Sequence, residues 1–180
     1  MRKLVVSEFL SLDGVMEDPA WTAPYWNDEI AAFKGAEMAA VDALLLGRLT
    51  YEGFAQAWPS RTDEESGGAR MNALPKHVVS TTLKRADWQN SSVLGLDVAG
   101  EVTALKAQQG GDMLVYGSGQ LVRFLLERGL VDQLNLLVYP VTVGAGKRLF
   151  GEVPAKLELL ETRGMGSGVA LMQYRPVSPS

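Results

Sequence analysis

The residues best suited to bind a ligand lie where a buried strand runs into an amphipathic helix. The apolar segment Met113–Tyr116 is followed by Gly117-Ser118-Gly119-Gln120, and Leu121 begins the helical spacing. Glycines allow a tight turn and a close backbone approach, and free N–H groups at a helix N-terminus favour a phosphate or diphosphate. The same pattern also fits a plain strand-to-helix turn that needs glycine for its shape.

Two further strand ends carry anion-binding chemistry. Gly47, Arg48 and Thr50 follow an apolar run, and an arginine with a hydroxyl can make charge-assisted bonds to phosphate. Ser80 and Thr81 end a third run with hydroxyls that suit a ribose 2′-phosphate. Helix capping and solvated charge are the alternatives for each. Because ligands of open α/β sheets bind at the carboxyl ends of strands, three such ends together favour a nucleotide site.

Several classes of chemistry are excluded by composition. The 180 residues include no cysteine and one histidine, His77, so disulfides, thiolate nucleophiles, sulfur-bound metals and multi-histidine metal sites are absent. We expect His77 to be structural and no metal to be bound. The sequence has no phosphate-binding loop of the GxxxxGK[ST] type, and Val122 replaces the third glycine of a Rossmann fingerprint.

The net charge and the hydropathy of the sequence argue against nucleic acid and membranes as binding partners. The formal net charge is −4, without the basic clusters that bind nucleic acid. The first apolar run is interrupted by Ser7 and Glu8, and no run approaches the length of a membrane span. We therefore expect a cytoplasmic protein with a small-molecule ligand, no nucleic acid and no membrane.

The pattern of short apolar runs predicts an α/β fold. Runs of strand length alternate with segments of helical spacing, which favours a mostly parallel sheet covered on both faces. The predicted strands are Leu4–Phe9, Ala43–Leu46, His77–Thr81, Met113–Tyr116 and Leu134–Tyr139. The predicted helices contain Ile30, Phe33 and Met38; Tyr51 and Phe54; Val102 and Leu105; and Leu121, Phe124 and Leu125, with Asn27 as the first N-cap.

Near the C-terminus, the alternation of predicted strands and helices ends. Leu157–Arg163 and Val169–Arg175, separated by a glycine-rich turn, predict an antiparallel hairpin. We expect a single domain over residues 1–175 and a frayed tail over 176–180. The stretch from Trp58 to Pro75 is predicted as a long loop that is functional or mobile.

These motifs, in this order, resemble the dihydrofolate reductase superfold. The resemblance rests on Leu45–Glu52, on Val78–Thr81 and on Val115–Gly119. Ser11-Leu12-Asp13-Gly14 and Pro140–Phe150 further resemble the reductase domain of the bifunctional riboflavin-biosynthesis deaminase-reductase, in its stand-alone form. The similarity covers about Lys3 to Phe150. It implies a dihydrofolate reductase-like three-layer sandwich with a mostly parallel central sheet and a C-terminal antiparallel hairpin.

The resemblance implies NADPH as cofactor and a pocket beside it. The implied cofactor-binding residues are Gly47, Arg48, Thr50, Ser80, Thr81, Gly117, Ser118, Gly119, Gln120 and Leu121. The substrate pocket is expected between the Asp13 loop, the first helix and the segment Gly144–Phe150. Hydride transfer needs no protein nucleophile, because the dihydronicotinamide supplies the hydride.

Candidate catalytic and substrate-binding residues are charged. Alignment to the reductase helix places Glu29 at the pocket carboxylate, with Asp28 beside it, and both equally suit the dipole of a helix N-terminus. Asp13 is a second catalytic candidate. Lys147 and Arg148 are candidates to hold a sugar phosphate, or are simply solvated.

The main functional hypothesis is an NADPH-dependent reductase of a pyrimidine or pterin-like compound, with 5-amino-6-(5-phosphoribosylamino)uracil of riboflavin biosynthesis as a specific candidate. The alternative is a non-catalytic nucleotide-binding or interaction module that keeps the reductase scaffold. The resemblance also suggests a homodimer.

Overall fold

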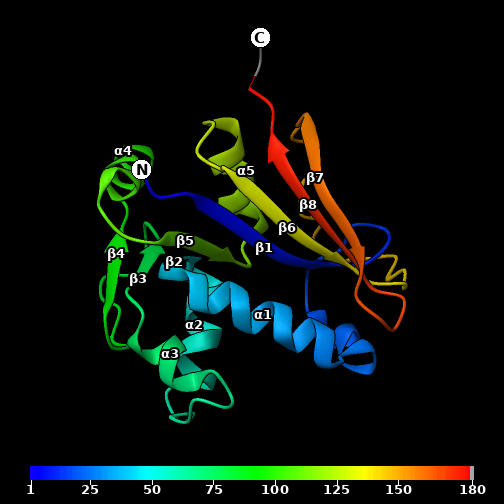
Figure 1. Ribbon diagram of the computed structural model, residues 1–180. Coiled ribbons are helices and arrows are strands. Elements are labelled where there is room, and N and C mark those ends of the chain that lie inside the picture. The colour runs from blue at the N-terminus through cyan, green and yellow to red at the C-terminus, as the bar shows by residue number, and fades with distance from the viewer. Residues whose placement is uncertain (179–180) are drawn as a thin grey trace.

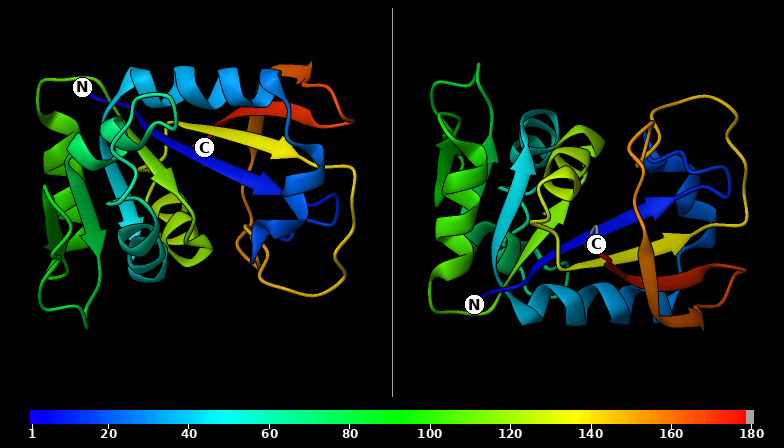
Figure 2. Two further views of the ribbon diagram at one scale, coloured as in Figure 1. Left: turned by 90° about the horizontal axis from the view of Figure 1, so that it is seen from below. Right: turned by 90° about the horizontal axis from the view of Figure 1, so that it is seen from above.

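The structure, a computed structural model that describes residues 1–178, is built on one eight-stranded sheet (Figure 1). The strand order is β4-β3-β2-β5-β1-β6-β8-β7. The first six strands in that order are mutually parallel, and β8 and β7 are antiparallel. Figure 2 shows this hairpin at the opposite end of the sheet from β3 and β4. The strands are β1 (Leu4–Leu10), β2 (Val41–Gly47), β3 (Lys76–Val79), β4 (Ser91–Leu94), β5 (Asp112–Tyr116), β6 (Gln133–Val138), β7 (Leu157–Gly164) and β8 (Ala170–Pro176).

Helices cover both faces of the sheet. They are the 3-10 helix η1 (Pro19–Tyr25), α1 (Asp28–Ala40), α2 (Arg48–Ala57), α3 (Gly68–Ala73), α4 (Val98–Ala107) and α5 (Gly119–Glu127). Successive side chains of a strand point to opposite faces of the sheet, and the side chains of β5 alternate in this way. Met113 and Val115 pack with α4 and α5, while Leu114 packs with α2 and α3. Both faces are apolar, which explains why the central strands read as continuous apolar runs.

The predicted fold class is confirmed, with three local elements missed, the 3-10 helix η1, helix α3 and strand β4. The central strands, the four amphipathic helices and the closing hairpin all form within a few residues of their predicted bounds. Asn27 caps α1 by accepting a hydrogen bond from the Ile30 N–H at 3.0 Å. The predicted loop from Trp58 to Pro75 contains helix α3, and the polar edge strand β4 was not predicted.

The predicted tail begins too early. Pro176 belongs to β8, and the Val177 N–H donates to the Lys156 carbonyl at 2.8 Å. The last two positions of the predicted tail, 179 and 180, lie outside the described residues. Within residues 1–178, the helices are too short or too polar to cross a lipid bilayer.

Candidate functional site

One large cavity lies at the carboxyl ends of β2, β3 and β5. Its volume is about 2130 Å³, and it extends from these strand ends to the inner side of α1. All of the predicted cofactor-binding residues line it: Gly47, Arg48, Thr50, Ser80, Thr81, Gly117, Ser118, Gly119, Gln120 and Leu121. Three segments that are distant in sequence therefore meet where parallel strands end, as the topology requires.

The turns after β2 and β5 touch each other through glycine. A Cβ on Gly117 would overlap the Thr50 side chain, and a Cβ on Gly47 would overlap both the hydroxyl and the Cβ of Ser118. Gly117 also has a φ of +65°, which glycine adopts without strain. Ser118 accepts a hydrogen bond from the Leu121 N–H at 3.3 Å and so caps α5. The first turn of α5 is thereby fixed beside the first turn of α2.

Polar side chains surround this pair of turns. The Arg48 guanidinium donates to both carboxylate oxygens of Glu52, at 3.0 and 3.1 Å, which holds it along α2. The Ser80 hydroxyl accepts from the Thr82 and Leu83 N–H groups at 3.1 and 2.9 Å and shapes the turn after β3. Thr81 is exposed and lines the cavity. Backbone amides, hydroxyls and a cation at one place favour an extended polyanion.

The cavity exists because β5 leaves the sheet before β1 ends. The pairing of these strands stops at Ser7 and Tyr116, after which Gly117 turns the chain away. Strand β1 continues to Leu10 beside β6 alone. A gap thus opens in the centre of the sheet next to the turn that precedes α5. The residue of β1 at this gap is Glu8, which lines the cavity.

Glu8 is a buried carboxyl without a hydrogen-bond partner on one of its oxygens. Its side chain is 6% exposed, and Oε1 has no partner. Desolvation by burial raises the pKa of Glu8 to about 8, while the Lys34 charge and the Gly117 amide oppose the increase. The carboxyl therefore carries its proton near neutral pH.

A second buried carboxyl, Glu37, is fully satisfied. Its Oε2 accepts from the Lys34 ammonium at 2.5 Å and from the Tyr116 hydroxyl at 3.1 Å, and its Oε1 accepts from the Asn135 amide at 2.9 Å. Lys34 also donates to the Ser7 hydroxyl at 2.7 Å and lies 4.4 Å from the centre of the Tyr116 ring. Glu37 is thus the counter-ion of Lys34, and of these two buried carboxyls it is Glu8 that lines the cavity.

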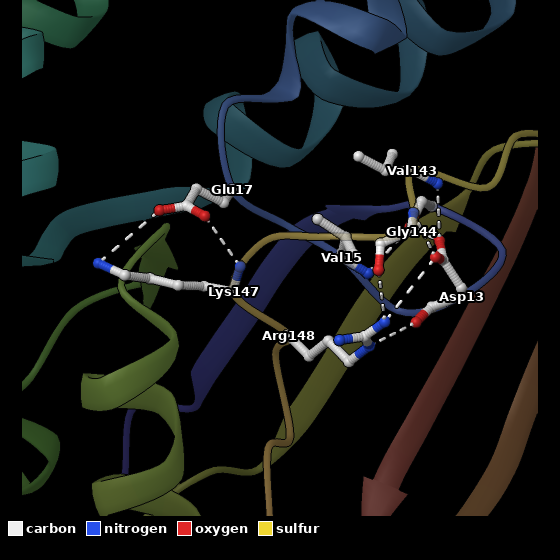
Figure 3. Close-up of polar contacts among 8 residues, drawn as sticks. Asp13, Val15, Glu17, Val143, Gly144, Lys147 and Arg148 are labelled. Carbon is white, nitrogen blue, oxygen red and sulfur yellow. Dashed lines mark hydrogen bonds and ion pairs between the residues drawn. The ribbon is translucent and has the colours of Figure 1, made fainter.

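Asp13, whose catalytic role stays a prediction, holds two loops together. Its carboxylate accepts from the Ser11 hydroxyl at 2.6 Å and from the N–H groups of Val143 and Gly144 at 3.1 and 2.8 Å (Figure 3). These bonds, with the Ser11 hydroxyl the largest contributor, lower the pKa of Asp13 to about 2. Asp13 is not among the residues that line the cavity. It ties the loop after β1 to the segment after β6.

Arg148 belongs to the same clamp. Its Nε donates to the Asp13 carbonyl at 3.1 Å, and its guanidinium lies 3.9 Å from the Asp13 carboxylate. Arg148 is exposed and does not line the cavity, whereas the neighbouring Lys147 does. The Lys147 N–H donates to Glu17 at 3.0 Å, and its ammonium is 3.9 Å from the same carboxylate. Of these two candidates for a sugar phosphate, the structure brings only Lys147 to the site.

The structure also leaves Asp28 and Glu29 outside the cavity. Both are exposed in the first turn of α1, where they complement the helix dipole. The inner side of this helix presents Ala31, Lys34, Gly35 and Met38 to the cavity instead. Helical periodicity explains the difference, because Glu29 lies five positions from Lys34 and so on a different side of the helix.

The sequence did contain a signal for Glu8. Leu4, Val6 and Leu10 alternate along one face of β1 and join the core beneath α5, and Glu8 occupies the position between Val6 and Leu10 in that series. A charged residue at a core position of a central strand is rare unless it has a function. His77 lies outside the cavity and is 3.1 Å from the Ser92 hydroxyl, in keeping with a structural role.

Comparisons with known proteins agree with this geometry. The family model described as RibD C-terminal domain matches residues 2–171. An uncharacterized Bacillus subtilis protein, YyaP, is 31% identical over 139 residues, which cover 74% of this chain and 73% of that protein. A pyrimidine reductase-like protein from Corynebacterium diphtheriae superposes with a TM-score of 0.69 at 14% identity, covering 99% of this chain and 93% of the other.

Dihydrofolate reductase from Enterococcus faecalis, solved with NADP(H), superposes with a TM-score of 0.62 at 15% identity. The match covers 98% of this chain and 97% of that one. The predicted dihydrofolate reductase-like fold is therefore confirmed.

The contact between the two turns predicts a specific stability loss. Gly47→Ala places a methyl group against Ser118 and should destabilise the fold by about 1–3 kcal/mol, the usual cost of overpacking. Gly53→Ala is the control, because that helical glycine is exposed with open space around it. It should stabilise α2 by up to about 1 kcal/mol. Urea denaturation measures the free energy of unfolding of both variants. Equal changes for the two substitutions would contradict the close contact between Gly47 and Ser118.

The clamp at Asp13 predicts a loss of stability that depends on pH. Asp13→Asn should lower the melting temperature at neutral pH, because the amide forfeits the charge-assisted bonds. The contribution of a carboxyl with a lowered pKa is present above its unfolded pKa and is lost as pH falls through about 2. The difference in melting temperature between Asp13→Asn and wild type, measured by circular dichroism, should decrease as pH falls from about 4 to about 2. A difference in melting temperature that stays constant over this pH range would contradict the hydrogen bonds assigned to Asp13.

Burial of Glu8 predicts the opposite dependence. The folded protein holds the Glu8 proton more tightly than the unfolded chain, so this stability is present at low pH and is lost as pH rises to about 8. The stability of wild type relative to Glu8→Gln should fall between about pH 5 and pH 8. Lys34, Glu37, Tyr116 and the Gly117 amide face Glu8 and are common to both proteins. A relative stability that does not change over this range would mean that Glu8 is not desolvated.

Proposed function

Because the chain belongs to the RibD C-terminal domain family, we propose that it is an NADPH-dependent reductase that transfers hydride to a pyrimidine or pterin-like small molecule. A specific candidate substrate is 5-amino-6-(5-phosphoribosylamino)uracil of riboflavin biosynthesis. The observation that carries the proposal is that every residue expected to bind the cofactor lines one cavity.

The residues present fit the phosphates of NADPH. The N–H groups of Ser118, Gly119 and Gln120 and the positive end of α5 suit the diphosphate. The two glycines allow its close approach to backbone, and Arg48 with Thr50 adds a cation and a hydroxyl from α2. Ser80 and Thr81 are placed for a 2′-phosphate. The Enterococcus faecalis dihydrofolate reductase, which shares this fold, was solved with NADP(H).

The rest of the cavity suits a flat heterocycle with a charged substituent. Phe9, Trp26 and Tyr116 supply aromatic surface, and Trp26 is 49% exposed. Lys147 adds a positive charge at the outer end, where it suits a phosphate. Bound NADPH would supply the hydride, and the chain's own residues would position the acceptor and exclude water.

The expected homodimer and cytoplasmic location remain predictions. Leu159 and Leu160 on the edge strand β7 are 50% and 47% exposed, and such apolar side chains support a subunit contact at this edge. The expectation of a single domain likewise stays a prediction.

Cofactor choice gives the sharpest test of the binding residues. Thr81→Glu places a carboxylate where we expect the 2′-phosphate, so it should weaken NADPH binding about tenfold or more, or about 1.4 kcal/mol, and leave NADH binding nearly unchanged. Thr103→Glu on the exposed side of α4 is the control and should alter neither affinity. Titration calorimetry measures the dissociation constants of NADPH and NADH for wild type and for each variant. Wild type that fails to bind NADPH at millimolar concentration would refute the proposed function.

Turnover separates the enzyme from the non-catalytic alternative. NADPH oxidation is followed by absorbance with 5-amino-6-(5-phosphoribosylamino)uracil, 7,8-dihydrofolate and a cyclic imine as acceptors. We expect oxidation with at least one of them. Tight NADPH binding without oxidation in this panel would favour a nucleotide-binding or interaction module.

A further inference from the structure

The gap between β1 and β5 holds one acidic group that the binding of a cofactor does not use. Glu8 lies on the face of β1 that also carries Val6 and Leu10, and these two residues pack with the α5 side of the core. The Gly117 amide is close enough to influence the Glu8 carboxyl. Glu8 therefore lies beside the turn that is proposed to hold the cofactor.

Other carboxyls in the cavity lining are unsuited to donate a proton in a dry site. Glu17 is bound to the Lys147 backbone amide, and its side chain is 39% exposed. Asp18, Glu64 and Glu65 are exposed on outer loops. Among the described residues that line the cavity, Glu8 is the one buried carboxyl.

The surroundings of Glu8 suit a group that alternates between acid and carboxylate. Its Oε1 is buried and has no hydrogen-bond partner, and Glu8 is among the residues that line the cavity. Lys34 is already paired with Glu37, so it does not hold Glu8 permanently ionised. Once Glu8 loses its proton, however, the Lys34 charge and the Gly117 amide both stabilise the carboxylate. A proton donor needs this balance, since its two forms must be close in free energy at the working pH.

We propose that Glu8 is the catalytic acid of this site, the group that protonates the substrate nitrogen when hydride reaches the neighbouring carbon. The inference rests on the proposed function. When bound, NADPH would supply the hydride with both electrons to the carbon of a carbon–nitrogen double bond, and the π electron pair of that bond would move to the nitrogen. The nitrogen would take the proton of Glu8 and become N–H, which leaves the Glu8 carboxylate to regain a proton from water.

The first test examines Glu8 without any substrate. Carbon-13 NMR of protein labelled at glutamate carboxyls, compared between wild type and Glu8→Gln, identifies the Glu8 signal. We expect it to titrate near pH 8, as its burial implies. A signal that titrates near the ordinary glutamate value would overturn the proposal.

The second test separates binding from chemistry. Glu8→Gln should bind NADPH within about twofold of wild type, yet reduce the fastest acceptor of the panel at least about 100-fold more slowly. The kcat of wild type should decline above about pH 8 as Glu8 ionises, and the residual kcat of Glu8→Gln should not show this decline. Glu158→Gln, an exposed residue of β7 paired with Arg175, is the matched control and should keep wild-type kcat.

The outcomes of these tests separate the role of Glu8 from the proposed reductase function. A Glu8→Gln protein that binds NADPH and retains kcat within about threefold refutes the role of Glu8, while the reductase assignment survives. Wild type that does not oxidise NADPH with any acceptor refutes the proposed function and the role of Glu8 with it.

Discussion

The site depends on the contact between two strand-to-helix turns that only glycine permits. Gly47 and Gly117 bring the ends of β2 and β5 so close that a methyl group on either would enter the opposite turn. Because both strands are parallel and adjacent, the N-termini of α2 and α5 then lie side by side at one edge of the sheet. The positive ends of two helix dipoles repel each other, and a bound polyanion relieves that repulsion. The backbone itself therefore selects the chemistry of the ligand.

The second constraint is the early departure of β5 from the sheet. It exposes the middle of β1 to a cavity, where a buried carboxyl is costly unless it is paired or protonated. Lys34 and Glu37 form a paired, hydrogen-bonded network on the α1 side of the gap, and Glu8 is kept neutral by burial on the other. Lys34, Glu37 and a protonated Glu8 together carry no net charge.

Sequence patterns predicted the parts of this arrangement that depend on local physics. The apolar runs defined the central strands, and glycines with hydroxyls at three strand ends predicted residues that line one cavity, because topology brings such ends together. Glu29 and Asp13 were chosen by position in a motif, and neither side chain lines the cavity, so their catalytic roles stay predictions. Glu29 lies on the solvent side of its helix, and Asp13 uses its oxygens on backbone amides 130 residues away. Strand β4 was missed because its serines give it no apolar run, and α3 because it is a single short helix in a polar stretch.

The proposed function requires that backbone amides at the ends of neighbouring parallel strands hold the diphosphate of NADPH. The most direct measurement is a crystal structure of the protein grown with NADPH. We predict diphosphate oxygens on the N–H groups between Gly117 and Leu121, the 2′-phosphate beside Ser80 and Thr81, and the nicotinamide in the gap next to Glu8. A cofactor bound elsewhere, or side chains of α2 and α5 closing the gap in its presence, would contradict the account.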